Sequence, residues 1–579
     1  MDPIAILWKT YSMGQLRGPP IPFTQGPMTS GDRASIRRGM RSHLRCISSH
    51  GCGAQHFKYA PMARCWSAIP SAMLSGLIVS LAISFAILGY FGRKYRQTLP
   101  LPPGPKQYPI VGNLNLPNKD QWIVYDRIAK EHNSDIIHIR TFGSSLIVLN
   151  SFAAAVDLLD RRSRISSSRP AATMLYDLMG WKSMFSIQPY GQEWRDRRRV
   201  FWQEFHPEHG QRHHRPIQLH YSRELVRRLY DSPLEFQAHI RHTIGASIIS
   251  IAYGLDVQGK DDPYITIANN ALEYLDISFA GTFMVDVFPI LRHVPRWMPG
   301  AGFRATGERA THALNLSIEV PYLQTLKSLT EGHGESTFVH RALSRGEIPS
   351  GGQEERVIKE SVAAAYIGAN ETTPFPLTIF FAIMAHNLDV QTKAQRELDQ
   401  YLDHRFPDFE DQPHLPYISA VMLETLRWEP MTPLGLAHGL ISDDKFRGYY
   451  LPKGSIVFYN VWAILRDETI FPEPDKFNPS RFLKDGLIDT QLKDRVMSSF
   501  GFGRRICPGR YFAMDTLWLS MASILSVYTI GKPVDESGRK VDIALKYKAG
   551  LNRHVLPFEC SIKPRSREAE ELILDLSRL

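Results

Sequence analysis

Cysteine is scarce in this chain, which has five in 579 residues. Three of them lie within the first 65 residues, and only Cys507 and Cys560 follow. Two cysteines in roughly 500 residues do not make a disulfide framework, so the main body is expected to fold in a reducing compartment. No two cysteines have the CxxC spacing, which excludes zinc ribbons and thioredoxin-like redox sites.

Acidic residues are nearly absent from residues 1–64, where Asp2 and Asp32 are the only two. The same segment holds nine Lys or Arg, so it contributes +7 of the chain's net charge of +10. The other residues are nearly balanced in charge and carry no basic stripe with interleaved aromatics, so nucleic-acid binding is not expected. We interpret residues 1–64 as a disordered basic leader, or as a segment upstream of the true start at Met62 or Met73. A transit peptide is the alternative.

Charged residues are missing altogether from residues 65–92, whose apolar centre, Ser71–Phe91, is 21 residues long. This length is enough to cross a bilayer as a helix, so we predict an N-terminal transmembrane anchor over 65–92; a buried helix of a soluble protein is the alternative. Residues 93–106 are basic and then rich in proline, which predicts a semi-rigid hinge. Cations lie on both sides of the apolar stretch, so charge alone leaves the orientation of the anchor open.

Internal repeats and low-complexity blocks are also absent. Residues 107–565 are predicted to form one large, mainly α domain with a minor β portion, followed by a tail at 566–579. Alternation predicts a β-hairpin over Asp135–Asn150, and short β signals return at Gly448–Asn460. Helical periodicity is found around Trp194 and over residues 356–385, 390–402, 417–428 and 511–527.

The neighbours of Cys507 distinguish it from an inert buried cysteine. The pattern F-x-x-G-x-R-x-C-x-G is met by Phe500, Gly503, Arg505, Cys507 and Gly509. Glycines allow a backbone to approach a flat cofactor and to turn N–H groups toward the sulfur, while nearby cations favour the thiolate, the form that binds iron. With this pattern the chain resembles the cytochrome P-450 superfamily of haem-thiolate monooxygenases.

The resemblance implies that Cys507 is the axial ligand of the iron of haem b and that the other residues of the pattern surround the cofactor. Trp194 and Arg198, in the segment YGQEWRDRRRVF, match the W-x-x-x-R motif of the family. Together with Arg505 they are implied to contact the haem propionates. His438 aligns with a further propionate contact in relatives.

A second motif, IGANETT, lies in a predicted helix and resembles the oxygen-binding helix of the family. Glu371 and Thr372 occupy the places of its acid and alcohol. A carboxylate beside a hydroxyl can hold water and relay protons, so the resemblance implies that this pair is catalytic. The chain departs from the family in having Ala369 where glycine is common. Pro374 and Pro376 follow closely and predict a break or kink after the motif.

A third motif joins Glu424 and Arg427, three residues apart on one helix face, to Arg481 in FNPSRF. In the family such a triad is structural, and we predict the same role here. The chain has Ser480 where glutamate is frequent, but the arginine is retained. An exposed ion pair of little energetic weight is the alternative.

These motifs occur in the same order as in the family and cover residues 100–565. Two longer stretches resemble the fungal membrane-bound branch of the family, which includes O-methylsterigmatocystin oxidoreductase-type enzymes. No GxGxxG segment follows a predicted strand, so NADPH-cytochrome P-450 reductase is the implied source of electrons. The implied reaction is hydroxylation of a hydrophobic small molecule with O₂, in fungal secondary metabolism or xenobiotic oxidation. The implied location is the endoplasmic reticulum membrane, with the catalytic domain facing the cytosol.

The substrate class stays open among terpenoids, steroids, polyketides and polycyclic aromatics. The segment Met174–Phe185 is rich in Met, Leu and aromatics and is predicted to line an apolar pocket. Two other functions are alternatives: a haem-thiolate isomerase or dehydratase that works without a reductase, and a non-catalytic haem-binding protein. The acid–alcohol pair favours the monooxygenase, because the isomerases and dehydratases can dispense with it.

Overall fold

The described part of the chain begins at Leu99 in the computed structural model. It covers residues 99–576 except 109–111, 114–118, 142–143, 258, 260–261, 281–282, 334–335, 346–351 and 549–551, together with Ser80, Leu81 and Ser84. The chain divides into two units after Thr98, and the leader, nearly all of the anchor predicted at 65–92 and the start of the hinge lie outside the described residues. Among the described residues, no helix combines the length and the apolar character that a bilayer crossing requires.

Helices make up most of this body, as the sequence predicts. The longer helices are α3 (Gln121–Glu131), α6 (Gln192–Phe205), α8 (Arg215–Asp231), α9 (Phe236–Tyr253), α10 (Pro263–Ala280), α12 (Gly302–Thr330), α14 (Gln353–Thr372), α15 (Pro374–His386), α16 (Leu388–Leu402), α17 (Pro416–Trp428) and α20 (Arg510–Val527). The shorter helices are α4 (Phe152–Ala155), α5 (Ser163–Ser166), α7 (Pro207–His213), α11 (Met284–Val287), α13 (Phe338–Ser344), α18 (Val461–Ile464), α19 (Thr490–Val496) and α21 (Arg567–Asp575).

The β portion is a four-stranded sheet with several two-stranded ribbons. The sheet has the order β1–β2–β6–β3, in which β2 and β6 run parallel and the other pairs antiparallel. Its strands are β1 (Ile136–Thr141), β2 (Ser144–Leu149), β6 (Ile456–Tyr459) and β3 (His438–Gly439). The ribbons pair β4 (Asp444–Phe446) with β5 (Tyr449–Leu451), β7 (Leu483–Lys484) with β8 (Leu487–Ile488), β9 (Tyr528–Gly531) with β12 (Ser561–Pro564), and β10 (Tyr547–Lys548) with β11 (His554–Val555). The predicted hairpin and the later β signals are therefore confirmed.

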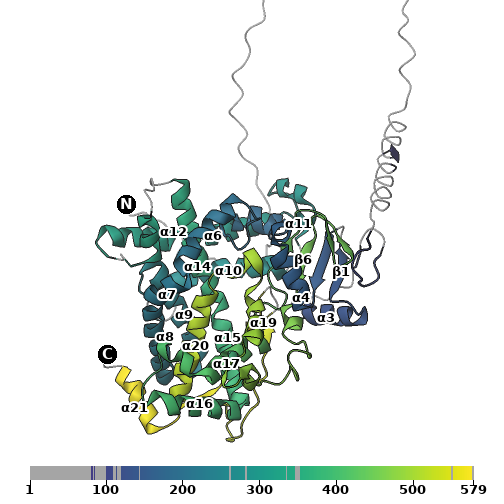
Figure 1. The fold of residues 1–579 in the computed structure, drawn as a ribbon. Coiled ribbons are helices and arrows are strands. Elements are labelled where there is room, and N and C mark those ends of the chain that lie inside the picture. The colour runs from purple at the N-terminus through teal and green to yellow at the C-terminus, as the bar shows by residue number, and fades with distance from the viewer. Residues whose placement is uncertain are drawn as a thin grey trace, which may run out of the picture. The chain divides into compact units, whose positions relative to one another are not determined.

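Helix α14 lies in the middle of the helical part, where it packs against α6, α9, α10 and α12. Figure 1 shows this helical part on one side of the body and the sheet, with α3 and α4 against it, on the other. The helices packed around α14 enclose one apolar core. A second apolar core lies around α15, α16, α17 and α20 and reaches the sheet. The two cores approach each other where α14 gives way to α15, and this junction carries the IGANETT motif.

The break predicted from Pro374 and Pro376 is confirmed at this junction, because the periodicity over residues 356–385 is divided between two helices. α14 ends at Thr372 and α15 begins at Pro374, with Thr373 between them. Proline lacks the N–H that would continue the ladder, but it suits the first turn of a new helix. The break leaves Glu371 and Thr372 in the last turn of α14, at the end of a rigid element.

Candidate active site

A cavity of about 330 Å³ lies between α6, α10, the C-terminal half of α14 and the loop that precedes α20. This volume falls in the range of small-molecule sites in proteins. Most of its lining is apolar, including Trp181, Met184, Phe201, Phe205, Leu272, Leu275 and Leu517. Its polar lining includes Cys507, Glu371, Thr372, Thr432, Asn552, Arg169, Arg198 and Arg505.

The Cys507 loop forms one wall of this cavity. The N–H of Cys507 donates to the carbonyl of Phe500 over 2.7 Å, and the loop then enters α20 at Arg510. The sulfur therefore lies just before the N-terminus of an 18-residue helix, and the N–H groups of Gly509 and Arg510 point toward it. Helix N-termini and N–H donors stabilise a thiolate.

The charge state of Cys507 is set by opposing influences. Burial raises the pKa of the Cys507 thiol, while the N–H of Gly509 and the charges of Arg198 and Arg510 lower it. The N–H groups and cations predicted from the sequence are present, but burial is the stronger influence on this pKa. The backbone donors and cations thus prepare a site in which a thiolate becomes stable once a metal ion takes up its charge.

The two glycines of the motif have different roles. Gly509 lines the cavity, and a Cβ placed there would have only the Phe201 ring, at 4.0 Å, as a neighbour. Gly503 is not part of the lining. It has a positive φ of 53°, and a Cβ there would lie 2.4 Å from the carbonyl oxygen of Leu159. The prediction that Gly503 contacts the cofactor is therefore replaced by a conformational role in close backbone packing.

Three arginines, Arg169, Arg198 and Arg505, line the cavity, and two of them lie beside Trp194. The guanidinium carbon of Arg505 lies 4.6 Å from the Trp194 ring centroid, and that of Arg198 lies 5.9 Å from it. Arg505 donates to the carbonyls of Ser167, Phe185 and Gln188 at 2.6–3.1 Å. Arg198 donates to the carbonyl of Ile506, and Arg169 to those of Ser186, Leu436 and Ala437.

None of these arginines has a carboxylate partner within ion-pair distance among the described residues. Burial lowers the pKa of Arg169 and of Arg198 to about 10. Burial and the charges of Arg169 and Arg198 lower the pKa of Arg505 to about 8. Three arginines thus line one cavity without a carboxylate in ion-pair contact, an arrangement that favours the binding of an anionic group.

This arrangement fits haem b. The sulfur of Cys507 can ligate iron, the open space beside Gly509 admits a flat ring, and the two propionates of haem supply the negative charge that the arginines lack. The structure therefore brings together five residues that the sequence predicted to bind the cofactor: Cys507, Arg505, Trp194, Arg198 and Gly509, with Phe500 beside them.

His438 lies outside the cavity lining. It is buried in β3, and its Nδ1 lies 2.7 Å from the carbonyl oxygen of Ser166, so it donates there. Burial, together with the charges of Arg169 and Arg505, holds the pKa of His438 well below its usual range. A neutral histidine bound to the backbone supports the sheet beside Arg169, and a direct contact with a propionate does not follow from this geometry.

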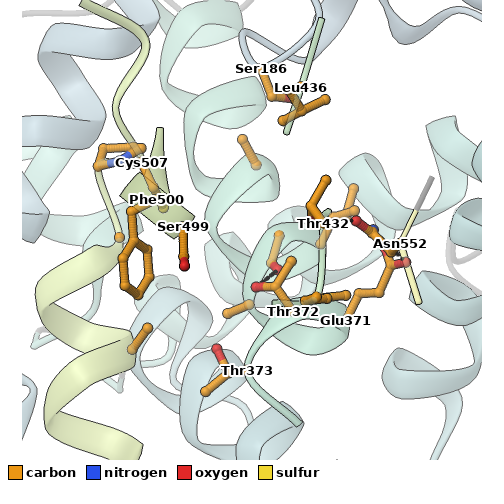
Figure 2. A pocket seen from close by; sticks show the side chains of 18 of the residues that line it. Ser186, Glu371, Thr372, Thr373, Thr432, Leu436, Ser499, Phe500, Cys507 and Asn552 are labelled. Atoms are coloured by element: carbon orange, nitrogen blue, oxygen red, sulfur yellow. Dashed lines mark hydrogen bonds between the residues drawn. The ribbon is translucent and has the colours of Figure 1, made fainter. Parts of the chain in front are cut away.

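The acid–alcohol pair lines the same cavity as Cys507. Figure 2 shows Cys507 and Phe500 on one side of the view, Glu371 and Asn552 on the other, and Thr372 between them. The Thr372 hydroxyl donates to the carbonyl of Gly368 over 2.8 Å. Glu371 accepts from Asn552 over 2.9 Å, and burial raises the pKa of its carboxyl group.

The third motif does not border the cavity, and its pair Glu424–Arg427 is fully buried. Glu424 accepts from Nε of Arg427 over 2.5 Å and from Nε of Arg481 over 3.2 Å. It also accepts from the backbone N–H of Asn478 over 2.8 Å. Both Glu424 and Arg427 have no exposed surface. The exposed-pair alternative is therefore excluded, and the geometry is that of a core ion-pair network.

Sequence reasoning missed several residues of the site. Arg169 is one: it lies in an irregular segment before Pro170, and no local pattern marks it as a cofactor-binding residue. The others are Asp276, Asn552 and His554, which surround Glu371. These three come from α10 and from the segment around β11, and no local pattern connects them with α14.

Comparison with known proteins agrees with this site. The family model described as cytochrome P-450 matches residues 102–547. The chain is 39% identical to cytochrome P-450 monooxygenase 98 of Postia placenta, over 87% of this chain and 98% of that protein. It is 40% identical to cytochrome P-450 monooxygenase ple1 of Rhodocybe pseudopiperita, over 82% and 91%, and 36% identical to tryptamine 4-monooxygenase of Psilocybe cyanescens, over 85% and 98%.

The chain therefore belongs to the cytochrome P-450 family and is a haem-dependent monooxygenase of the fungal type. Its cofactor is haem b. Monooxygenases of this family generally use a redox partner and act on hydrophobic substrates. The family membership predicted from the Cys507 motif is confirmed.

We expect Arg169→Ala to weaken haem retention about tenfold, since a hydrogen bond to a charged group contributes roughly 1.5–3 kcal/mol. The measurement is the transfer of haem to apomyoglobin, followed by absorbance. Arg169→Lys keeps the charge and is expected to lose less. Equal haem retention in wild type and both variants would contradict a role for Arg169 in holding the propionates.

Proposed function

We propose that the enzyme hydroxylates a hydrophobic small molecule according to RH + O₂ + NADPH + H⁺ → ROH + H₂O + NADP⁺, with electrons delivered by NADPH-cytochrome P-450 reductase. One observation carries the proposal: Cys507 and the pair Glu371–Thr372 line one and the same cavity. The metal ligand and a proton source therefore face a shared space, which oxygen activation with net proton uptake requires.

Haem bound through Cys507 would supply the activation of O₂, which the side chains themselves do not provide. Glu371 has a different task in the same cavity. Its raised pKa makes it a better proton donor near neutral pH than an ordinary carboxyl group. Thr372 bonds to the Gly368 carbonyl, so its hydroxyl is oriented in the last turn of α14 and can pass a proton on.

The substrate is proposed to be apolar and polycyclic or terpenoid in character, with steroids and polyketides in the same class. The aromatic and aliphatic lining supports this, because Trp181, Phe201 and Leu272 offer contact area and no charge. The predicted segment Met174–Phe185 contributes Trp181, Met184 and Phe185 to that lining. The tryptamine substrate in the name of one relative is not assigned to this chain.

We further propose that the enzyme is held at the endoplasmic reticulum membrane by the anchor predicted at residues 65–92, with the catalytic body in the cytosol, and that it serves fungal secondary metabolism or xenobiotic oxidation. The relatives are fungal monooxygenases over nearly their whole length, which supports this setting. The membrane lipid would also concentrate apolar substrates near the cavity.

We expect Glu371→Gln to lower product formation about 100-fold, since a positioned acid contributes roughly 10²–10⁴-fold to such steps. The full-length enzyme is combined with a fungal reductase, a panel of apolar compounds is screened with the wild type, and product per NADPH is measured on a compound that is converted. Glu354→Gln, the same change in the exposed first turn of α14, is the matched control. Conversion of an oxygenated compound without NADPH would instead favour the isomerase or dehydratase.

A further inference from the structure

Glu371 belongs to a cluster that the acid–alcohol motif does not include. Nε2 of His554, on β11, lies 2.9 Å from Oδ2 of Asp276, on α10, and 3.3 Å from Oε1 of Glu371, at the end of α14. The Nε2 atom is itself buried, and its N–H forms no hydrogen bond of good geometry with either carboxylate. A single imidazole nitrogen thus lies between two carboxylates that belong to different helices.

Exposure increases in steps from the cavity outward. The Glu371 side chain is 9% exposed, that of Asp276 is 13% exposed and that of His554 is 28% exposed. Glu371 lines the cavity, whereas His554 does not. His554 therefore has access to solvent that Glu371 lacks, and Glu371 has access to the cavity that His554 lacks.

The charges around His554 favour its protonated form. Asp276 and then Glu371 raise the pKa of His554 above its usual value, against the effects of burial and of Lys548 on the paired strand β10. Burial and Asp276 raise the pKa of Glu371, while Asn552 and His554 lower it. A cationic imidazole and a carboxyl group of raised proton affinity thus lie within 3.3 Å of each other.

We propose that His554, positioned by Asp276, reprotonates the Glu371 carboxylate with protons taken from solvent during each turnover. The inference rests on the proposed role of Glu371. In each transfer the Nε2–H bond of the imidazolium breaks and an O–H bond forms on Glu371, which leaves a neutral imidazole. Before each transfer Glu371 has passed its own proton into the cavity. The transfer leaves Nδ1–H and vacates the buried Nε2, so a half-turn of the partly exposed ring brings the vacant nitrogen to solvent, where it takes up a proton, and turns the other N–H toward Glu371. The oxidant and the electrons remain O₂ and NADPH.

The hydrogen-bond partners of Glu371 fix this geometry. Asn552 donates to Oε1 of Glu371 and accepts from the hydroxyl of Thr432 over 2.9 Å, so it is held from both sides. Asn552 and His554 are two residues apart in the segment that enters β11. One short stretch of chain therefore sets both the orientation of the acid and its contact with the imidazole.

The test compares His554→Gln with Asp276→Asn and with a control, His220→Gln, on the exposed surface of α8. The haem-bound enzyme is used with reductase and a converted apolar compound. We expect His554→Gln to lower product per NADPH about tenfold, with more peroxide and a larger solvent isotope effect, because reprotonation of Glu371 becomes slower. Asp276→Asn is expected to have a smaller effect in the same direction, and the control none.

The charge of His554 can be followed without turnover. A histidine whose folded pKa is raised stabilises the fold fully below its unfolded pKa, and this contribution is lost as pH rises through the folded pKa. The difference in melting temperature between wild type and His554→Gln is therefore expected to shrink from pH 6 to pH 9. The same difference is expected to be smaller in the Asp276→Asn background.

Several results would overturn the relay. One is an unchanged product yield and isotope effect in His554→Gln. Another is a melting difference that does not vary with pH. A third is a stoichiometric metal ion in the purified enzyme that is lost in His554→Gln, since the same three side chains could ligate one. If Glu371→Gln is impaired while His554→Gln is normal, the relay fails and the proposed function stands.

Discussion

Cys507→Ala is expected to abolish NADPH-dependent product formation and the red-displaced Soret band that reduced, carbon monoxide-bound thiolate haem gives. Alanine removes the only thiol in the cavity lining of the described residues. Without the thiolate, the electron density that favours O–O cleavage is lost. We expect activity at the background of the assay, a loss of more than about 10³-fold in line with the removal of an essential group. The measurement pairs carbon monoxide difference spectra with product formation.

Cys560→Ala is the matched control for this prediction. Cys560 is the other cysteine of the described body; it is buried in the core, away from the cavity, and burial raises the pKa of its thiol to about 12. A neutral thiol of this kind acts as a small apolar group. We expect the variant to keep the spectrum and the activity. A normal spectrum in Cys507→Ala, or its loss in Cys560→Ala alone, would contradict the assignment of the ligand.

Local patterns were sufficient to predict several of the elements and to single out Cys507 as the candidate ligand. The alternation over Asp135–Asn150 and the helical periodicities depend on neighbours within a few residues, and the structure has β1, β2 and the helices at those places. The Cys507 motif is likewise contained in ten residues. Pro374 signalled the break in the long helical run, because the lack of an N–H is a property of the residue itself.

Long-range partners could not be predicted in this way. Asp276 and His554 are brought to Glu371 by the packing of α10, α14 and β11. Glu371 lies in a recognisable motif, but Asp276 and His554 have an ordinary sequence context. The same applies to Gly503, whose need for a small side chain comes from the carbonyl of Leu159. Local sequence does not specify which distant backbone passes a given residue.

Burial of charge is another property that one-dimensional patterns leave open. Glu424 and Arg427 have the spacing of a surface pair, and the sequence permitted both an exposed and a buried reading. The structure places them in the core because every face of α17 is covered by other elements, including α15, α16 and α20. The energetic weight of the pair changes accordingly, from negligible to large.

Arg427→Ala is therefore expected to destabilise the enzyme by about 3–5 kcal/mol, because it leaves a buried carboxylate with fewer donors. Glu424→Ala is expected to cost more, since it removes the acceptor of Arg427, of Arg481 and of the Asn478 N–H at once. The measurement is guanidinium unfolding of the haem-bound enzyme, followed by circular dichroism and by haem absorbance.

The order of the two variants is the decisive part of this prediction. Arg567→Ala removes an exposed ion pair with Glu571 on α21 and is the control, with no measurable change expected. If the triad is a core network centred on its single carboxylate, stability follows the order control, Arg427→Ala, Glu424→Ala, and haem loss follows unfolding. If the triad instead acted on the cofactor directly, haem would leave before the helices unfold, although no member of the triad borders the cavity. A destabilisation of Glu424→Ala no larger than that of the control would show that the buried pair contributes nothing to the fold.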